Sequence, residues 1–183
     1  MYELDVDLTQ AINALAGQSH LLDLMMIWVS TIGVPALVLG VALQWWRIDD
    51  RDHVRHVLVA TGLTFQLGLG FNQIIVHFIH RLRPYDVGVS QLLIARSADF
   101  SFPSDHATAS VAIAAALLLY GMRRVGLVFA AAAALICVSR VYVGTHYASD
   151  VIGGALTAVL AALLIPSLYG EGTRFDRFVT HIL

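Results

Sequence analysis

The chain contains four stretches of 18 residues or more that are largely free of charge, and a fifth that carries one arginine near its end. A bilayer core offers no hydrogen-bond partners to the backbone, so a spanning segment must satisfy its peptide groups internally, as a helix does. Each stretch is close to the ~20 residues that a helix needs to cross the hydrocarbon core. The sequence therefore predicts a helical membrane protein rather than a water-soluble domain.

The predicted organisation is a single polytopic bundle. We expect membrane-crossing helices at about residues 21–46, 54–79, 104–121, 125–143 and 146–168, with a long loop at 80–103. Ahead of them, Leu8, Ile12 and Leu15 stand at helical spacing behind Asp7, which predicts a short interfacial helix at about residues 5–18. No internal repeat or linker-like segment divides the chain. The expected fold class is all-α, with five transmembrane helices and one interfacial helix in a single domain, residues 1–183.

Composition narrows the functional classes. Of the 183 residues, 58% are hydrophobic and 13% are charged, against about 25% charged in soluble domains, which also excludes intrinsic disorder. The 11 basic residues are all arginine and the formal net charge is −2, so no basic face for nucleic acid is expected. Cys137 is the single cysteine, which excludes a disulfide framework or a cysteine-based metal site within one chain.

The arginines predict an orientation. Segments on one side of the bundle hold Arg47, Arg51, Arg55, Arg123, Arg124, Arg174 and Arg177. Because cytoplasmic loops collect Lys and Arg, we expect the N-terminus and the 80–103 loop outside and the C-terminus in the cytoplasm. Against this preference, the outer side holds Arg81, Arg83, Arg96 and Arg140. These four arginines need another explanation.

Three separate segments bring polar residues to the outer ends of the predicted spans. They contain Arg81, Arg83 and Pro84; then Pro103, Ser104, Asp105 and His106; then Arg140, His146 and Asp150. A charge within a span costs about 2.5–3.5 kcal/mol on insertion scales, so these groups should be paired around a polar cavity. A lone arginine at a helix end would more simply reach the lipid headgroups. Two histidines and an aspartate beside the arginines favour a shared site.

These residue types fit phosphate chemistry. The arginine side chain offers a planar fork that matches phosphate oxygens, and the first amides of the third span form an anion-attracting helix N-terminus. His146 and Asp150 are four residues apart, so on one helical face the carboxylate can hold one imidazole nitrogen and leave the other as a nucleophile. His106 can protonate a leaving oxygen. The pattern suggests in-line phosphoryl transfer.

The same residues resemble a known family. Arg83-Pro84, Pro103-Ser-Asp-His106 and Ser139-Arg140-x5-His146-x3-Asp150 are similar to the three-part signature of the type 2 phosphatidic acid phosphatase superfamily, relatives of the vanadium haloperoxidases. The stretch from Phe102 and the early Ile12-Asn-Ala-Leu-Ala-Gly segment more closely resemble the bacitracin-resistance type of undecaprenyl-diphosphate phosphatases. The resemblance implies the helical core of the acid phosphatases and haloperoxidases.

The resemblance also implies roles. It implies hydrolysis of a membrane lipid diphosphate in two steps, with no metal and no cofactor. His146 is the implied nucleophile, Asp150 its orienting group and His106 the proton donor to the leaving phosphate. The implied phosphate-binding residues are Arg83, Arg140, Ser104 and Arg81.

Two positions depart from the family pattern. The family's first motif begins with a lysine seven residues before its arginine, where this chain has Val76. Arg81 is the first choice to replace that lysine, with His77 or His80 as further sources of positive charge. Asp105 stands where the family usually has glycine, and an acid at a helix N-terminus is its simplest explanation.

Other functions stay open at this point. The substrate can be another lipid phosphate, such as phosphatidylglycerol phosphate or phosphatidic acid, because the motifs define the phosphate site and not the tail. A second class is a non-enzymatic metal- or haem-binding protein that uses His77, His80, His106 and His146. The neighbouring arginines argue against it, since like charges repel.

Location and partners follow from the resemblance and the charge asymmetry. They predict a bacterial plasma membrane, an active site that faces outside, and a role in recycling a glycan carrier lipid. Nothing in the sequence indicates an obligate protein partner, and the oligomeric state stays open.

Overall fold

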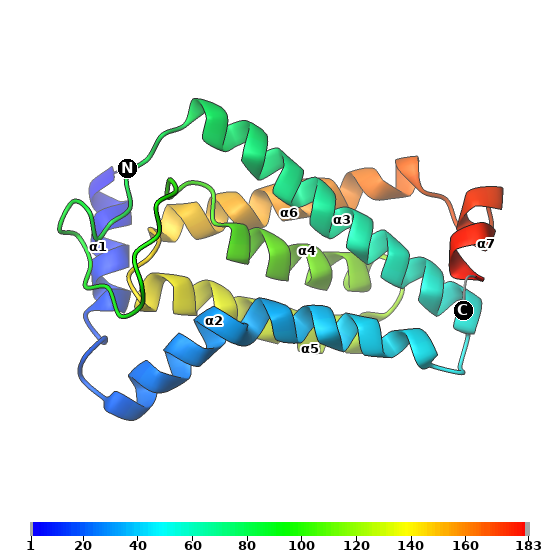
Figure 1. Ribbon diagram of the computed structural model, residues 1–183, viewed down its shortest axis with the longest axis horizontal. Helices are drawn as coiled ribbons and strands as arrows, with labels where there is room; N and C mark the ends of the chain where they lie inside the picture. Colours follow the sequence, from blue (N-terminus) through cyan, green and yellow to red (C-terminus); the bar gives the residue numbers. More distant parts are fainter. Residues whose placement is uncertain (1, 182–183) are drawn as a thin grey trace.

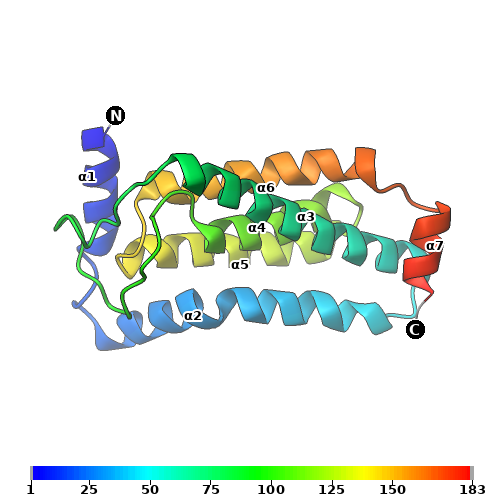
Figure 2. The ribbon, with the colours of Figure 1, turned by 45° about the horizontal axis from the view of Figure 1, so that its top comes forward.

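The computed structural model describes residues 2–181, and these form an all-α bundle, as predicted. The helices in chain order are α1 (Tyr2–Asn13), α2 (His20–Leu43), the short 3-10 helix η1 (Gln44–Trp46), α3 (Arg51–Phe78), α4 (Asp105–Leu119), α5 (Arg123–Tyr142), α6 (Ala148–Leu168) and α7 (Arg174–Thr180). Helices α2 to α6 run lengthwise, while α1 lies across one end and α7 lies at the other (Figure 1, Figure 2).

Four helices of the described chain are long and apolar enough to cross a membrane. They are α2 with η1, α3, α5 and α6. Helix α4 is apolar but has only 15 residues, fewer than the ~20 needed to span, so the prediction of five membrane-crossing helices is wrong by this measure. The helix starts after Pro103 and ends before Gly121, whose φ of 109° breaks it.

Helix α4 forms the centre of the bundle. It contacts α2, α3, α5 and α6, and its buried residues include Ala107, Ala112 and Ala116. Small side chains let the surrounding helices approach closely, which favours helix association in membranes. Because its neighbours enclose it, α4 does not need the length of a lipid-facing span.

Two glycines of α6 lie in close contact with the segment that leads into α4. A Cβ added to Gly154 would lie 2.5 Å from the Ser104 carbonyl oxygen, and one added to Gly153 would lie 2.4 Å from the Phe102 ring. Gly153 and Gly154 are therefore close-packing residues. Their lack of a side chain fixes the start of α4, which carries His106, against the start of α6, which carries Asp150.

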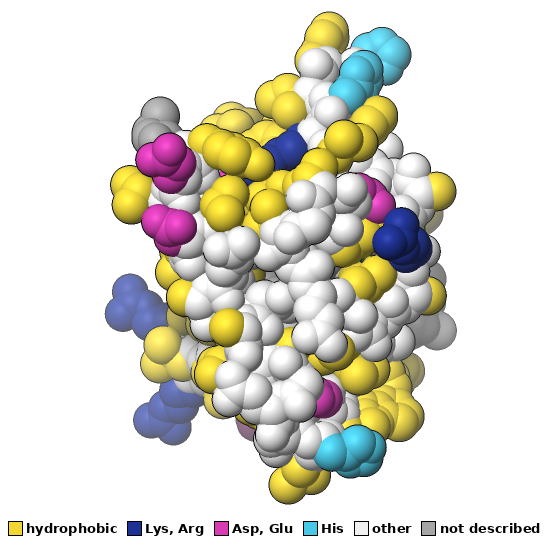
Figure 3. Space-filling model, turned by 90° about the vertical axis from the view of Figure 1, so that its left-hand side faces the viewer, with side chains coloured by type: hydrophobic (Ala, Val, Ile, Leu, Met, Phe, Trp, Pro, Cys, Tyr) yellow, Lys and Arg dark blue, Asp and Glu magenta, His cyan; other side chains and the backbone are white. Residues whose placement is uncertain are grey.

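The end helices differ in part from the expectation. The short N-terminal helix exists, but α1 begins at Tyr2, so Asp7 lies inside it and is exposed rather than capping it. Figure 3 looks onto this end of the bundle and shows a mostly uncharged face with isolated acidic and basic side chains. The interfacial position of α1 stays a prediction. Helix α7 was not expected from the sequence, and a hydrogen bond between Nδ1 of His56 and Oδ1 of Asp176 at 2.8 Å connects it to α3.

We predict that Gly154→Ala destabilises the protein by about 1–3 kcal/mol, since an added methyl group overpacks the α4–α6 contact. The matched control is Gly70→Ala in α3, where an added Cβ meets nothing within 4 Å. The control should be neutral or stabilise by up to about 1 kcal/mol, because alanine is the better helix former. Thermal unfolding of both variants in detergent tests this, and equal unfolding temperatures would contradict the close-packing role.

Candidate active site

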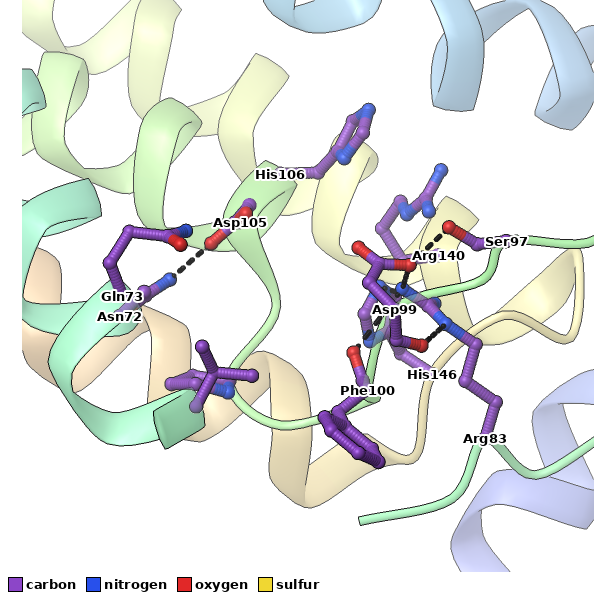
Figure 4. Close-up of a pocket in the computed structure, with 12 residues that line it drawn as sticks. Asn72, Gln73, Arg83, Ser97, Asp99, Phe100, Asp105, His106, Arg140 and His146 are labelled. Atoms are coloured by element: carbon purple, nitrogen blue, oxygen red, sulfur yellow. Dashed lines mark hydrogen bonds and ion pairs between the residues drawn. The ribbon is translucent and has the colours of Figure 1, made fainter. Parts of the chain in front are cut away.

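A cavity of about 220 Å³ opens at the end of the bundle that carries α1. It is lined by Asn72, Gln73, Val76, Arg83, Ser97, Asp99, Phe100, Pro103, Asp105, His106, Arg140 and His146. The structure thus brings the three sequence segments to one place. Figure 4 shows His106 and Asp105 on the α4 wall, opposite the wall that carries Arg83, Arg140 and His146.

The imidazole of His146 is held in one orientation. Its Nδ1 lies 2.8 Å from the carbonyl oxygen of Ser101, and since a carbonyl only accepts, Nδ1 carries the proton. The other nitrogen, Nε2, then carries the lone pair and accepts a hydrogen bond from Nη1 of Arg83 at 3.2 Å. His146 is 3% exposed and lines the cavity, so the lone pair belongs to a buried, preoriented group.

His146 and Asp150 do not share a helical face as predicted. Helix α6 begins only at Ala148, so His146 lies in the preceding turn. The Asp150 carboxylate forms the capping box of α6 and accepts a bond from the Tyr147 amide at 2.8 Å. Its Oδ2 lies 3.6 Å from Nδ1 of His146, which is an ion-pair distance and too long for a hydrogen bond.

Ser101 connects these two groups. Its hydroxyl donates to Oδ2 of Asp150, while its carbonyl accepts from His146. Asp150 therefore orients His146 mainly through Ser101. Sequence reasoning missed Ser101, because nothing in its local pattern separates it from the other serines of the 80–103 loop.

Arg83 is 4% exposed and uses its donors inside the protein. Nη1 donates to the Thr145 carbonyl at 2.9 Å, and Nη2 donates to Oδ1 of Asp99 at 2.9 Å. The Asp99 side chain is 64% exposed. Although partial burial opposes it, the Ser97 hydroxyl and the Arg83 guanidinium lower the pKa of Asp99. The carboxylate of Asp99 thus bonds to the Arg83 guanidinium, which the sequence analysis assigned to phosphate.

Arg140 and Ser104 keep buried polar atoms without a partner among the described residues. Arg140 donates from Nη1 to the Ser30 hydroxyl at 2.6 Å, but its Nε has no acceptor. The Ser104 hydroxyl is also unpaired, although the Ser104 amide donates to the Asp150 carbonyl at 3.0 Å. Arg140 lines the cavity directly, whereas Ser104 lies between the lining residues Pro103 and Asp105. An unpaired buried polar group costs about 1–3 kcal/mol, and an anionic oxygen would satisfy both.

The structure places Arg81 behind the cavity rather than in it. Its guanidinium donates to Asp150 at 2.7 Å and to Asp5 at 2.6 Å, and it covers the Tyr147 ring at 3.7 Å. These bonds raise the pKa of Arg81, although burial opposes the shift. Because Arg81 bonds to these two carboxylates, it does not lie at the phosphate-binding position predicted for it. Val76, which stands where the family has lysine, does line the cavity.

Asp105 belongs to a polar contact between helices. The Asn72 side-chain amide donates to Asp105 at 2.7 Å and to Thr108 at 2.8 Å, and its carbonyl accepts from Thr157 at 2.9 Å. Asn72 of α3 therefore forms hydrogen bonds to both α4 and α6. Asp105 points toward Asn72 and not toward the arginines (Figure 4).

The histidines required by the metal-binding alternative lie in different places. His77 packs edge-on against Phe78, and His80 lies on Phe100, while only His106 and His146 line the cavity. Between residues 2 and 181, no group of three or more His, Cys, Asp or Glu side chains is placed to hold a metal ion. The geometry favours an anion as the ligand of this site.

The cavity of this apolar helical bundle thus joins two histidines, His106 and His146, to two buried arginines, Arg83 and Arg140. Residues 53–174 match the PAP2 superfamily, and the chain belongs to this superfamily as a multi-pass membrane lipid phosphatase. The family resemblance inferred from the three motifs is confirmed.

Individual relatives extend the comparison. The chain is 32% identical over 161 residues to undecaprenyl-diphosphatase BcrC of Bacillus subtilis (strain 168), covering 88% of this chain and 82% of that protein. It is 35% identical over 130 residues to sphingosine-1-phosphate phosphatase 2 of Homo sapiens, covering 67% of this chain and 31% of that protein. The crystal structure of a PAP2-type phosphatidylglycerolphosphate phosphatase from Bacillus subtilis shares the fold, with a TM-score of 0.69 at 23% identity over 95% of this chain and 88% of that chain.

Proposed function

We propose that this protein hydrolyses undecaprenyl diphosphate to the monophosphate and phosphate through a phosphohistidine at His146. The observation that carries the proposal is the fixed imidazole of His146 in the cavity wall, whose Nδ1 is held by Ser101 and whose Nε2 lone pair accepts from Arg83, a donor that a bound phosphate would take over. The similarity to undecaprenyl-diphosphatase BcrC over most of both chains supports the choice of lipid.

In the first step, Nε2 of His146 attacks the terminal phosphorus, and the bond from phosphorus to the bridging oxygen breaks. The electron pair leaves on the oxygen of the lipid monophosphate, which takes a proton from His106. Arg83, Arg140 and the Ser104 hydroxyl stabilise the charge on the non-bridging oxygens. The negative charge of the bound headgroup stabilises the protonated form of His106 that this step requires.

In the second step, water attacks the phosphohistidine. His106 accepts the proton from the water, the bond from phosphorus to Nε2 breaks, and inorganic phosphate leaves. Between the steps the imidazole is positively charged, because Nδ1 keeps its proton while Nε2 carries phosphorus. The Ser101 carbonyl and the Asp150 carboxylate stabilise that charge.

The free enzyme keeps His146 ready for attack. Burial lowers the pKa of His146, and the charges of Arg140 and Arg83 act in the same direction, although Asp150 opposes them. A lowered pKa keeps the imidazole neutral down to a lower pH than an ordinary histidine. The imidazole of His146 is therefore uncharged at neutral pH, with its one proton on Nδ1 and none on Nε2.

We further propose a bacterial plasma membrane location with the N-terminus outside and the C-terminus in the cytoplasm. The cavity lies at the end with the exposed loop, and the arginine clusters of residues 47–55, 123–124 and 174–177 lie in segments at the other end. A carrier lipid diphosphate released on the outer face would meet the site there, and its hydrolysis would regenerate the monophosphate form for another cycle as glycan carrier.

We predict that His146→Ala abolishes phosphate release from undecaprenyl diphosphate in detergent or vesicles, because no other group in the cavity is oriented to attack phosphorus. Wild-type activity should persist in excess chelator and be inhibited by vanadate, which mimics the five-coordinate phosphorus. Phosphate release is measured in parallel with phosphatidylglycerol phosphate, phosphatidic acid and sphingosine-1-phosphate. Faster turnover of one of these would replace the proposed substrate, and substantial activity of His146→Ala would remove the proposed nucleophile.

We predict that His106→Ala slows hydrolysis by roughly 10²- to 10⁴-fold for substrates with poor leaving groups, since proton donation then contributes most. An activated ester such as p-nitrophenyl phosphate needs little protonation and should lose less. The comparison of the two substrate classes is the measurement. An equal loss for both classes would show that His106 does not act as the proton donor.

We predict that Asp99→Asn lowers the inhibition constant for inorganic phosphate by about two- to fivefold, because it removes a carboxylate that competes for Arg83. The effect is limited because a largely exposed ion pair is worth at most about 1 kcal/mol. Asp86→Asn is the matched control, since Asp86 pairs with the exposed Arg96 at 3.4 Å. A raised inhibition constant in Asp99→Asn would instead mean that Asp99 orients Arg83 for binding.

A further inference from the structure

Helix α1 presents a polar stripe to the active site. Asp5, Thr9 and Asn13 are spaced four residues apart and so lie on one helical face. Thr9 and Asn13 are buried, while Asp7 on the same helix is exposed. The stripe therefore packs against the protein and not against solvent.

The Asp5 carboxylate bonds to two segments. Oδ2 accepts from Nη2 of Arg81 at 2.6 Å and from the Ser149 hydroxyl at 2.5 Å, and Oδ1 accepts from the Ser149 amide at 2.9 Å. The amides at the start of a helix lack partners within it, and a carboxylate there is favourable. Asp5 thus both caps the start of α6 and holds Arg81.

The other two residues of the stripe extend this connection. Thr9 accepts from the Ala148 amide at 3.1 Å. Asn13 bonds to the Gln91 amide at 2.7 Å, to the Gln91 carbonyl at 2.9 Å and to the Tyr142 carbonyl at 2.8 Å. One face of α1 therefore joins the loop that carries Arg83, the end of α5 that carries Arg140 and the start of α6 that follows His146.

A continuous chain of contacts leads from α1 to the nucleophile. Arg81 lies between the carboxylates of Asp5 and Asp150. Asp150 accepts a hydrogen bond from the Ser101 hydroxyl, and the Ser101 carbonyl accepts one from Nδ1 of His146. The Arg81 backbone carbonyl also accepts from the Ser101 amide at 2.8 Å. A displacement of Arg81 would thus move the Ser101 amide through the Arg81 carbonyl, and the Ser101 hydroxyl through Asp150.

We propose that α1 is a positioning clamp of the active site and that Asp5 is a positioning residue, which acts through Arg81, Asp150 and Ser101 on His146. The proposal rests on His146 as nucleophile and not on the identity of the lipid. Asp5 does not line the cavity, so it fixes the direction of attack and leaves substrate binding to other groups. Misplacement of a reacting group lowers the rate of the chemical step more than it weakens binding.

The first test compares Asp5→Asn with the matched control Asp7→Asn in the full-length protein. Asp5→Asn should lower kcat roughly 10- to 100-fold and change KM by less than about twofold, while Asp7→Asn should match the wild type. Asp5→Glu, which keeps the charge, should recover most of the activity. Thermal unfolding is recorded for each variant, so that a loss of folded protein is separated from a loss of kcat.

The second test asks whether Asp5 acts through Arg81. Arg81→Gln alone should lower kcat at least as far as Asp5→Asn, and the double variant should lie within about twofold of Arg81→Gln. Multiplied effects in the double variant would overturn the proposed route. Ser149→Ala keeps every charge and removes one hydroxyl, which donates to Asp5 and accepts from Arg81, so it tests the clamp if Asp5→Asn does not fold. A decrease in its kcat at constant KM would support the clamp.

Wild-type kcat in both Asp5→Asn and Ser149→Ala, or a change in KM alone, would overturn the clamp. These outcomes differ from failure of the proposed function. In that case the wild type would release no phosphate from any lipid in the panel, or His146→Ala would remain active. The clamp is judged with whichever lipid phosphate the wild type hydrolyses.

Discussion

Compensation of buried charge determines how this bundle is built at its active end. The Asp150 side chain is fully buried, and an isolated buried charge costs several kcal/mol. Arg81 supplies the opposite charge through Nη1, and Asp5 pairs with Nη2 of the same guanidinium. Because each group must keep its partner, the start of α6, the loop after α3 and helix α1 are held in one arrangement. The imidazole of His146 is held in place as a consequence of this pairing.

The same rule separates supporting charges from those available to substrate. Asp150 and Arg81 are fully used within the protein, and neither lines the cavity. Arg140 keeps a buried donor without a protein acceptor, and Arg83 shares its fork with the exposed Asp99. The positive charge of the two arginines that line the cavity is therefore only partly paired with groups of the protein. Donors that are already in place stabilise developing negative charge without having to reorganise during the reaction.

The sequence predicted much of this site and missed the parts that depend on tertiary contacts. Motif order and the alternation of helix ends were sufficient to predict that Arg83, His106, Arg140 and His146 share a cavity. The proposed helical pairing of His146 with Asp150 failed because Asp150 caps α6, so the helix starts only after His146. Arg81 was assigned to phosphate because Asp5, its partner from a distant segment, cannot be recognised from spacing.

The predicted fold shows a similar division. The long apolar runs identified α2, α3, α5 and α6, whereas α4 was expected to be longer because apolar character alone does not separate an enclosed helix from a lipid-facing one. Helix α7 is short, and its place depends on a contact between His56 and Asp176, which are 120 residues apart.

The size and position of the cavity separate recognition of the headgroup from recognition of the lipid tail. The cavity's volume of about 220 Å³ and its charged walls suit a headgroup, and it lies at the end of the bundle. The cavity therefore leaves no room for the tail of the proposed isoprenoid substrate, which would lie along the apolar helices. Relatives named for undecaprenyl diphosphate and for sphingosine-1-phosphate are both similar to this chain over two thirds of its length or more, which fits a common cavity combined with different tail contacts. Changes on the lipid-facing helices can then alter the lipid, while the network from Asp5 to His146 keeps the chemistry constant.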